Sequence, residues 1–233
     1  MKTLLYLLFI FLVNPLNARE GIFIIDQKCS KIIEIRKFIY TTKPWFEVSY
    51  PQVYCKVRKN CLSALNEILK RNAMSGLDYL KQIYELEEYP EEAAGIYYFS
   101  LDYTFECNSF GYINIVIDEH SFLTGIPPFK WDNTYLFRLD QKRLLNLNDL
   151  VYTTPEFWDF LSKEISQSVN ARNAEMPKEK DFNKFTLSDT YLKFIFDPNI
   201  LDPNYGASFE GSIPISRIQK FLKPEIKKIY NLK

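Results

Sequence analysis

The chain has 233 residues, with 29 basic and 29 acidic side chains, one histidine and four cysteines. The balanced charge argues against a dedicated nucleic-acid binder, which normally carries a basic surface. A single histidine excludes a multi-histidine zinc site, and the sequence contains neither of the usual glycine-rich phosphate loops. A hydrophobic content of 47% excludes a disordered chain. We therefore expect a folded protein without a cofactor, without a metal centre and without enzymatic activity.

The first 18 residues have the organisation of a cleavable secretory signal. Lys2 precedes an apolar run, residues 3–13, which is shorter than the ~20 residues that a membrane-spanning helix needs. Ala18 supplies the small residue expected before a cleavage site. The alternative is a buried strand at the start of a cytosolic protein. Cleavage after Ala18 predicts a periplasmic or secreted protein with no stable membrane anchor.

All of the cysteines, Cys29, Cys55, Cys61 and Cys107, follow this segment. An even number of cysteines in an exported protein is typical of disulfides, and their spacing lacks the close pairs of a zinc site. Three connectivities are open. We prefer Cys55 with Cys61 and Cys29 with Cys107, because the first pair is close in sequence. A set of reduced, buried thiols is the alternative.

The first elements in chain order are two strands and a long helix. Residues 31–40 and 45–54 are rich in β-branched and aromatic side chains and flank a turn, which predicts two antiparallel strands. Residues 57–86 repeat apolar side chains mostly every three or four positions, which predicts an amphipathic helix with a kink or a break at Gly76. The strand that begins near residue 95 should then run parallel to 45–54, which brings the cysteines to one end of the sheet.

The remaining elements are mostly strands. Thr154 and Pro155 predict the cap and first position of a second helix. Strands are predicted at residues 95–106, 111–118, 129–140, 185–187, 191–196 and 207–215, and a short helix from Ser216. This order predicts an α+β fold, in which a mainly antiparallel sheet packs against the long helix and the second helix. We divide the mature chain into two linked modules, 19–125 and 126–233.

The order of motifs resembles that of a known family. Residues 135–140 and 144–150 are similar to its strand, tight turn and entry into a helix, and 185–187, 191–194 and 213–216 resemble its remaining strands. The chain thus resembles the paired extracellular modules of RsiV-type lysozyme-sensing anti-sigma factors, which also precede the catalytic domain of PdaC-type peptidoglycan deacetylases. The resemblance implies an exported bacterial binding module whose partner is a lysozyme-like protein or peptidoglycan.

The chain departs from this family between the middle strands. The family usually has a stretch similar to Gly-Gly-Ala-His, whereas residues 120–128 here begin with His120 and end with Pro127 and Pro128. Properties of the family that depend on this stretch are therefore not transferred.

Asp118, His120 and Ser121 have the side chains of a catalytic triad. On a strand, however, Ser121 points away from the other two, so we expect His120 to be an ordinary surface or loop histidine.

Partner-binding candidates come from charge and from aromatic side chains. Carboxylates near the end of the long helix would attract a basic lysozyme-like protein, and aromatic side chains on the next strand would stack on sugars. These candidates are Glu85, Glu87, Glu88, Glu91, Glu92, Tyr97 and Tyr103.

Asp197 and Asp202 offer oxygen ligands for calcium, but their Asp-Pro pairs are typical of turns. A structural envelope protein without a ligand, and a cell-wall hydrolase using acids such as Asp102 and Glu106, are the alternative functions.

Overall fold

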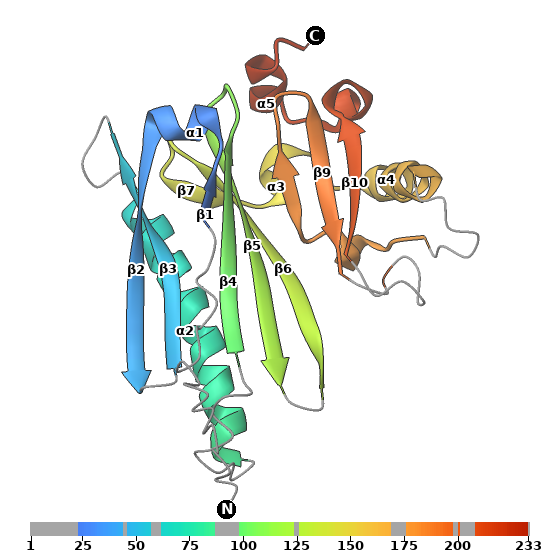
Figure 1. Ribbon diagram of the computed structural model, residues 1–233. Helices are drawn as coiled ribbons and strands as arrows, with labels where there is room; N and C mark the ends of the chain where they lie inside the picture. The colour runs from blue at the N-terminus through green and yellow to red at the C-terminus, as the bar shows by residue number, and fades with distance from the viewer. Residues whose placement is uncertain are drawn as a thin grey trace, which may run out of the picture.

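The computed structural model describes residues 23–43, 46–56, 62–86, 98–123, 126–168, 176–197, 200 and 208–232. The strands are β1 (Phe23–Ile25), β2 (Ile33–Lys43), β3 (Phe46–Cys55), β4 (Tyr98–Cys107), β5 (Tyr112–Leu123), β6 (Ile126–Arg138), β7 (Arg143–Leu145), β8 (Phe185–Leu187), β9 (Tyr191–Phe196) and β10 (Phe209–Pro214). The helices are α1 (Gln27–Ile32), α2 (Ser63–Leu86), α3 (Leu147–Leu150), α4 (Pro155–Ser168), η2 (Glu179–Asp181), η3 (Ile215–Phe221) and α5 (Pro224–Ile229). The predicted α+β class is confirmed (Figure 1).

A five-stranded sheet in the order β1-β4-β5-β6-β7 forms the centre of the molecule. Its pairs are antiparallel except for β1, which lies parallel to β4. Alternate residues of β4, including Leu101, Tyr103 and Phe105, belong to a core that also contains Leu65 and Leu69 of α2. Because side chains alternate along a strand, the residues between them lie on the opposite face of the sheet, away from α2.

The helix α2 begins at Ser63, later than predicted, and continues through Gly76 without a break. Asn66, in its first turns, pairs with the backbone of β3. Its side-chain oxygen accepts a hydrogen bond from the Val53 amide at 2.7 Å, and its side-chain nitrogen donates to the Val53 carbonyl at 3.0 Å. These two bonds pair the amide and the carbonyl of Val53 where α2 packs against β3. Among the described residues, no helix is both long and apolar enough to cross a membrane.

The predicted antiparallel pair near residues 31–54 is present as β2 and β3, which form a separate two-stranded sheet. We expected the strand after α2 to run parallel to β3. Figure 1 shows β3 and β4 side by side in the same direction, and residues of the two strands are in contact. In the described part of the chain, however, the hydrogen-bonded parallel partner of β4 is β1. The N-terminal strand therefore takes the edge position of the central sheet.

A second sheet, β10-β9-β8, packs with α4 and the C-terminal helices around its own hydrophobic core. The predicted cap of α4 is present, because the Thr154 hydroxyl accepts a hydrogen bond from the Phe157 amide at 3.3 Å. Phe157, Leu161 and Ile165 form the buried stripe of this helix. The module boundary at residues 125 and 126 falls in the hairpin between β5 and β6, so one hydrogen-bonded sheet extends across it.

Candidate functional site

A cleft of about 200 Å³ lies between the face of β4 and β5 that points away from α2 and the three-stranded sheet. Its lining comes from strands of both sheets: Thr104, Glu106, Val116, Asp118, Thr186, Lys193, Ile195, Ser208 and Glu210. These residues are distant in sequence, and only the packing of one sheet against the other brings them together. The cleft is therefore a property of the tertiary structure.

The lining of the cleft is mostly polar and carries more negative than positive charge. Glu106, Asp118 and Glu210 contribute carboxylates, and Lys193 is the basic residue among the described lining residues. The Lys193 ammonium forms an ion pair with the Glu210 carboxylate at 2.9 Å. Lys193 balances Glu210, and Glu106 adds a further carboxylate, so the described lining carries excess negative charge that favours a cationic ligand.

Asn114 holds the two walls of the cleft together at their buried end. Its side-chain oxygen accepts a hydrogen bond from the Leu187 amide at 2.7 Å, and its side-chain nitrogen donates to the Leu187 carbonyl at 3.0 Å. Asn114 is 2% exposed, so no bulk water can replace these bonds. The same carbonyl accepts a second hydrogen bond from Asn108, at 3.3 Å. Two buried amides of the β4–β5 hairpin thus fix the position of β8.

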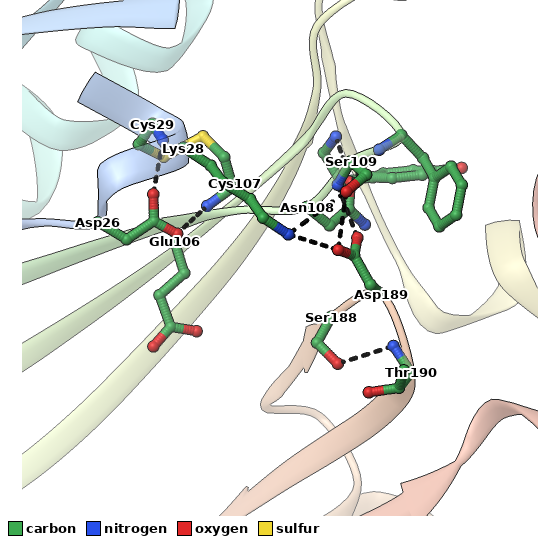
Figure 2. A network of polar contacts seen from close by, with 12 residues as sticks. Asp26, Lys28, Cys29, Glu106, Cys107, Asn108, Ser109, Ser188, Asp189 and Thr190 are labelled. Atoms are coloured by element: carbon green, nitrogen blue, oxygen red, sulfur yellow. Dashed lines mark hydrogen bonds and ion pairs between the residues drawn. A yellow bond between two sulfur atoms is a disulfide. The ribbon is translucent and has the colours of Figure 1, made fainter. Parts of the chain in front are cut away.

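A second connection joins the tips of two hairpins and is partly exposed (Figure 2). Asp189, in the turn between β8 and β9, accepts hydrogen bonds from the amide and the hydroxyl of Ser109, at 2.6 and 2.8 Å. Ser109 lies in the turn between β4 and β5. Lys28, from α1, forms an ion pair with the same carboxylate. The network therefore links α1 and both walls of the cleft through one aspartate.

Cys29 and Cys107 form a disulfide, the pairing that the sequence analysis preferred, with 4.9 Å between their Cα atoms. Asp26 supports this bond, because its carboxylate accepts from the amides of Cys29 and Cys107 at 2.5 and 2.9 Å (Figure 2). Cys55 is also disulfide-bonded. Its predicted partner, Cys61, lies outside the described residues. The first disulfide attaches α1, and with it Lys28, to the end of β4.

Replacing Asp189 with asparagine should make stability less dependent on acid. Partial burial acts to raise the pKa of this carboxyl, but the hydrogen bonds from Lys28 and Ser109 outweigh it and hold the pKa below its ordinary value. A lowered pKa stabilises the fold above the unfolded value of ~4, and this contribution is lost as the pH falls through the folded pKa. We expect Asp189→Asn to cost about 1 kcal/mol near neutral pH and less in acid.

Urea unfolding of both proteins near pH 7 and near pH 3 measures this difference. Asp159→Asn, an exposed position on α4, is the matched control and should leave the curves unchanged. An equal loss of stability at both pH values would contradict the role assigned to the Asp189 network.

The predicted partner-binding residues do not form one described surface. Tyr103 is fully buried against the α2 side of the sheet, so its prediction as a contact residue is wrong. Its position in β4 gives it the same orientation as Leu101 and Phe105, and these side chains build the core. Glu85 is the last residue but one of α2, but its side chain is outside the described part. The other predicted acids and the first aromatic candidate, Glu87, Glu88, Glu91, Glu92 and Tyr97, lie outside the described residues.

The remaining candidates fall in different places. His120 lies in β5, where its backbone pairs with Ser100 and Lys130, and not in a loop. Asp197 forms an ion pair with Lys184, which disfavours a second cation at this carboxylate; Asp202 lies outside the described residues. Of the two acids considered for a hydrolase, Glu106 lines the cleft and Asp102 is not among its lining residues.

Sequence reasoning did not single out Glu210, Lys193 and Thr186, or the part that Asp189 plays. The signal in the sequence for Asp189 is a turn between two strands, which is correct but does not name its partners across the molecule. Thr186, Lys193 and Glu210 lie on the three neighbouring strands β8, β9 and β10. Each is a polar residue on one face of its strand, a pattern that most two-faced sheets share. Their meeting with β4 and β5 depends on how the two sheets pack.

Comparison with solved structures decides the fold. The chain matches no family model and no curated protein sequence. It superimposes on a crystal structure of a DUF3298 family member from Bacteroides fragilis, with a TM-score of 0.56 and 13% identity over 85% of this chain and 97% of that chain. A DUF3298 family protein from Pseudomonas aeruginosa gives a TM-score of 0.57 and 14% identity over 83% and 95% of the two chains. The chain has the fold seen in the DUF3298 structures.

This DUF3298 fold accounts for the arrangement of the described elements. The likeness covers nearly the whole length of both solved proteins, so the central sheet and the smaller sheet belong to one recurring architecture. At 13% and 14% identity the likeness is one of backbone fold. The cleft residues are therefore described from this chain alone.

Proposed function

We propose that this chain is an exported bacterial binding protein, without catalytic activity of its own, whose partner is a basic protein of the lysozyme class. The acidic cleft between the two sheets is the observation that carries this proposal. A site with excess negative charge attracts a positively charged partner and speeds their encounter. The resemblance to the RsiV-type modules supports the choice of lysozyme among basic proteins.

Export is supported by the cysteines and by the N-terminal sequence. Disulfides persist in oxidising compartments such as the periplasm and the extracellular space. The bond between Cys29 and Cys107, and the absence of free thiols among the described cysteines, fit such a compartment. Residues 1–18 have the pattern of the signal that would direct the chain there.

A protein partner is favoured over a cell-wall glycan. Glycan binding through stacking needs exposed aromatic rings, and the two candidate rings of β4, Tyr103 and Phe105, are buried in the core, while the exposed rings Phe38, Tyr54, Tyr152 and Tyr191 lie outside the cleft lining. The cleft itself is lined by carboxylates, hydroxyls, one lysine and two aliphatic residues, with no aromatic ring among its described lining. Its volume of about 200 Å³ is below the usual range for a ligand pocket, and is too small for an oligosaccharide. A charged side chain of a larger partner suits the site better.

Binding is also favoured over hydrolysis. A hydrolase that uses two carboxyl groups needs one of them protonated near neutral pH, and burial is the usual means. Burial raises the pKa of Glu119, but this residue is not among the lining residues of the cleft. The carboxyl group with the raised pKa is therefore not part of the cleft proposed here as the binding site.

Calorimetry with lysozymes of several classes tests this function. We expect binding to at least one of them, weakened by high salt because screening reduces the attraction between the acidic site and the basic partner. The same titration with a lysozyme whose surface lysines are acetylated is the control, since acetylation removes positive charge. No heat of binding at ~100 μM protein with any lysozyme would remove this class of partner.

A further inference from the structure

Thr186 is a polar side chain in the cleft that has no protein partner. It is 5% exposed, and it lies between Phe185 and Leu187 of β8, whose side chains belong to the second core. Because side chains alternate along the strand, Thr186 faces the cleft, of which it is a lining residue. Among the described residues its hydroxyl has no hydrogen-bond partner in the protein, and it is not one of the fully buried unpaired atoms, so the cleft leaves it open to solvent. A hydroxyl in a nearly buried residue that opens only into the cleft is available to water or to a ligand there.

The groups around Thr186 are mainly acceptors. The carboxylates of Glu106 and Glu210 come from the two opposite walls, and the threonine hydroxyl is a further oxygen of the same lining. Lys193 is engaged by Glu210 at 2.9 Å. A ligand that fits these groups must therefore supply several donors and a positive charge in a small volume. A guanidinium group has five donors in a plane and remains charged, and it pairs well with carboxylates.

We infer that the cleft is a pocket for a single cationic side chain, of the arginine class, presented by a protein partner. The guanidinium would donate to the carboxylates of Glu106 and Glu210 and to the hydroxyl of Thr186. The volume of about 200 Å³ suits one side chain and excludes a larger ligand. This inference deepens the proposed function, because it assigns the partner's contact to one pocket and one chemical group.

A small probe tests the pocket directly. Nα-acetyl-arginine methylamide is titrated into the full chain, and backbone amide shifts are followed by NMR. We expect saturable shifts at Thr186 and Lys193 with a dissociation constant of ~1–10 mM, which is the affinity of a single contact. The citrulline analogue has nearly the same shape but no charge, and it should bind at least tenfold more weakly. Equal binding of the two probes, or shifts spread over the whole surface, would overturn the inference.

Three variants locate the binding. Glu106→Gln and Glu210→Gln keep the side-chain shape and remove charge, and each should weaken arginine binding about tenfold, the loss of one charge-assisted hydrogen bond. Thr186→Val removes the hydroxyl with little change in volume, and it should weaken binding by about threefold to tenfold. Asp159→Asn, on the solvent side of α4, is the control and should leave binding unchanged. Unchanged affinity in all three cleft variants would overturn the inference.

The same variants separate this inference from the proposed function. If a lysozyme binds the wild type and binds Glu106→Gln and Glu210→Gln equally well, the partner docks elsewhere and the pocket assignment fails. If no lysozyme binds but the arginine probe does so in the cleft, the pocket stands and the partner class fails. Thermal unfolding of each variant shows whether a loss of binding follows from a loss of folding.

Discussion

Replacing Cys29 and Cys107 together with alanine is expected to lower the free energy of unfolding by about 4 kcal/mol. The bond joins residues separated by 78 positions in the sequence, so it closes a long loop in the unfolded chain. Without it, the unfolded chain gains conformational entropy, and α1 loses its covalent attachment to β4. Lys28, which α1 carries toward Asp189, should then be held less firmly.

Urea unfolding followed by circular dichroism measures this loss. The dependence of the unfolding free energy on urea should also become steeper, because an unfolded chain without the cross-link exposes more surface. Asp26→Asn is a useful comparison, since it keeps the disulfide and weakens only the hydrogen bonds to the amides of Cys29 and Cys107. A loss below about 1 kcal/mol in the double alanine variant would show that the disulfide contributes little to stability.

Replacing Asn114 with alanine is expected to cost about 2–4 kcal/mol. The change leaves the amide and the carbonyl of Leu187 without their shortest partners in a buried place. Each buried polar group that loses its partner costs about 1–3 kcal/mol, and the hydrogen bond from Asn108 to the same carbonyl limits the total. The effect should also reach the cleft, because Thr186 precedes Leu187 on β8.

An aspartate at position 114 separates the two hydrogen bonds. Asn114→Asp keeps an acceptor for the Leu187 amide, but it places a carboxylate against the Leu187 carbonyl and, at neutral pH, has no proton to donate. Stability should therefore be low near pH 7 and should partly recover in acid, where the carboxyl group is protonated. Asn183→Ala, at an exposed position, is the control. An alanine variant as stable as the wild type would show that the two hydrogen bonds of Asn114 contribute little to holding β8 in place.

The elements themselves were largely predictable from local patterns. The apolar spacing of α4, with Thr154 and Pro155 at its start, predicted the helix and its first residue. The β-branched runs near residues 31–54 predicted the antiparallel pair of β2 and β3. In these segments propensity, capping and periodicity agree, so neighbouring residues contain enough information.

The first residue of α2 and the strand that pairs with β4 were harder to predict from the sequence. The apolar pattern begins near residue 57 and the described helix begins at Ser63, because periodicity does not fix the first residue of a helix. Residues 57–61 lie outside the described part of the chain. The parallel partner of β4 is the short strand β1, which has only three residues and so presents almost no pattern to read. Long-range pairing of this kind depends on which edge remains open when the sheet assembles.

The site residues were also only partly predictable, because local patterns identify a strand or a turn but not its partners in the fold. Tyr103 looked suited to binding because aromatic side chains alternate along β4, and the sequence does not say which of the two faces α2 covers. The choice of face buried Tyr103 and placed Glu106 in the cleft. Asp189 was identifiable as a turn residue, but its partners Ser109 and Lys28 are some 80 and 161 positions away in the chain.

The composition of the chain, which has one histidine, balanced charge and four cysteines, limited the chemistry that it can perform. The order of the predicted elements indicated the class of fold, and the closeness of Cys55 and Cys61 in the sequence led to the preferred pairing of Cys29 with Cys107. The tertiary structure decided which face of β4 and β5 is free and which strand of the second sheet lies opposite it. Those choices follow from how two cores pack around one shared sheet, and they bring Glu106, Thr186 and Glu210 to a common cleft.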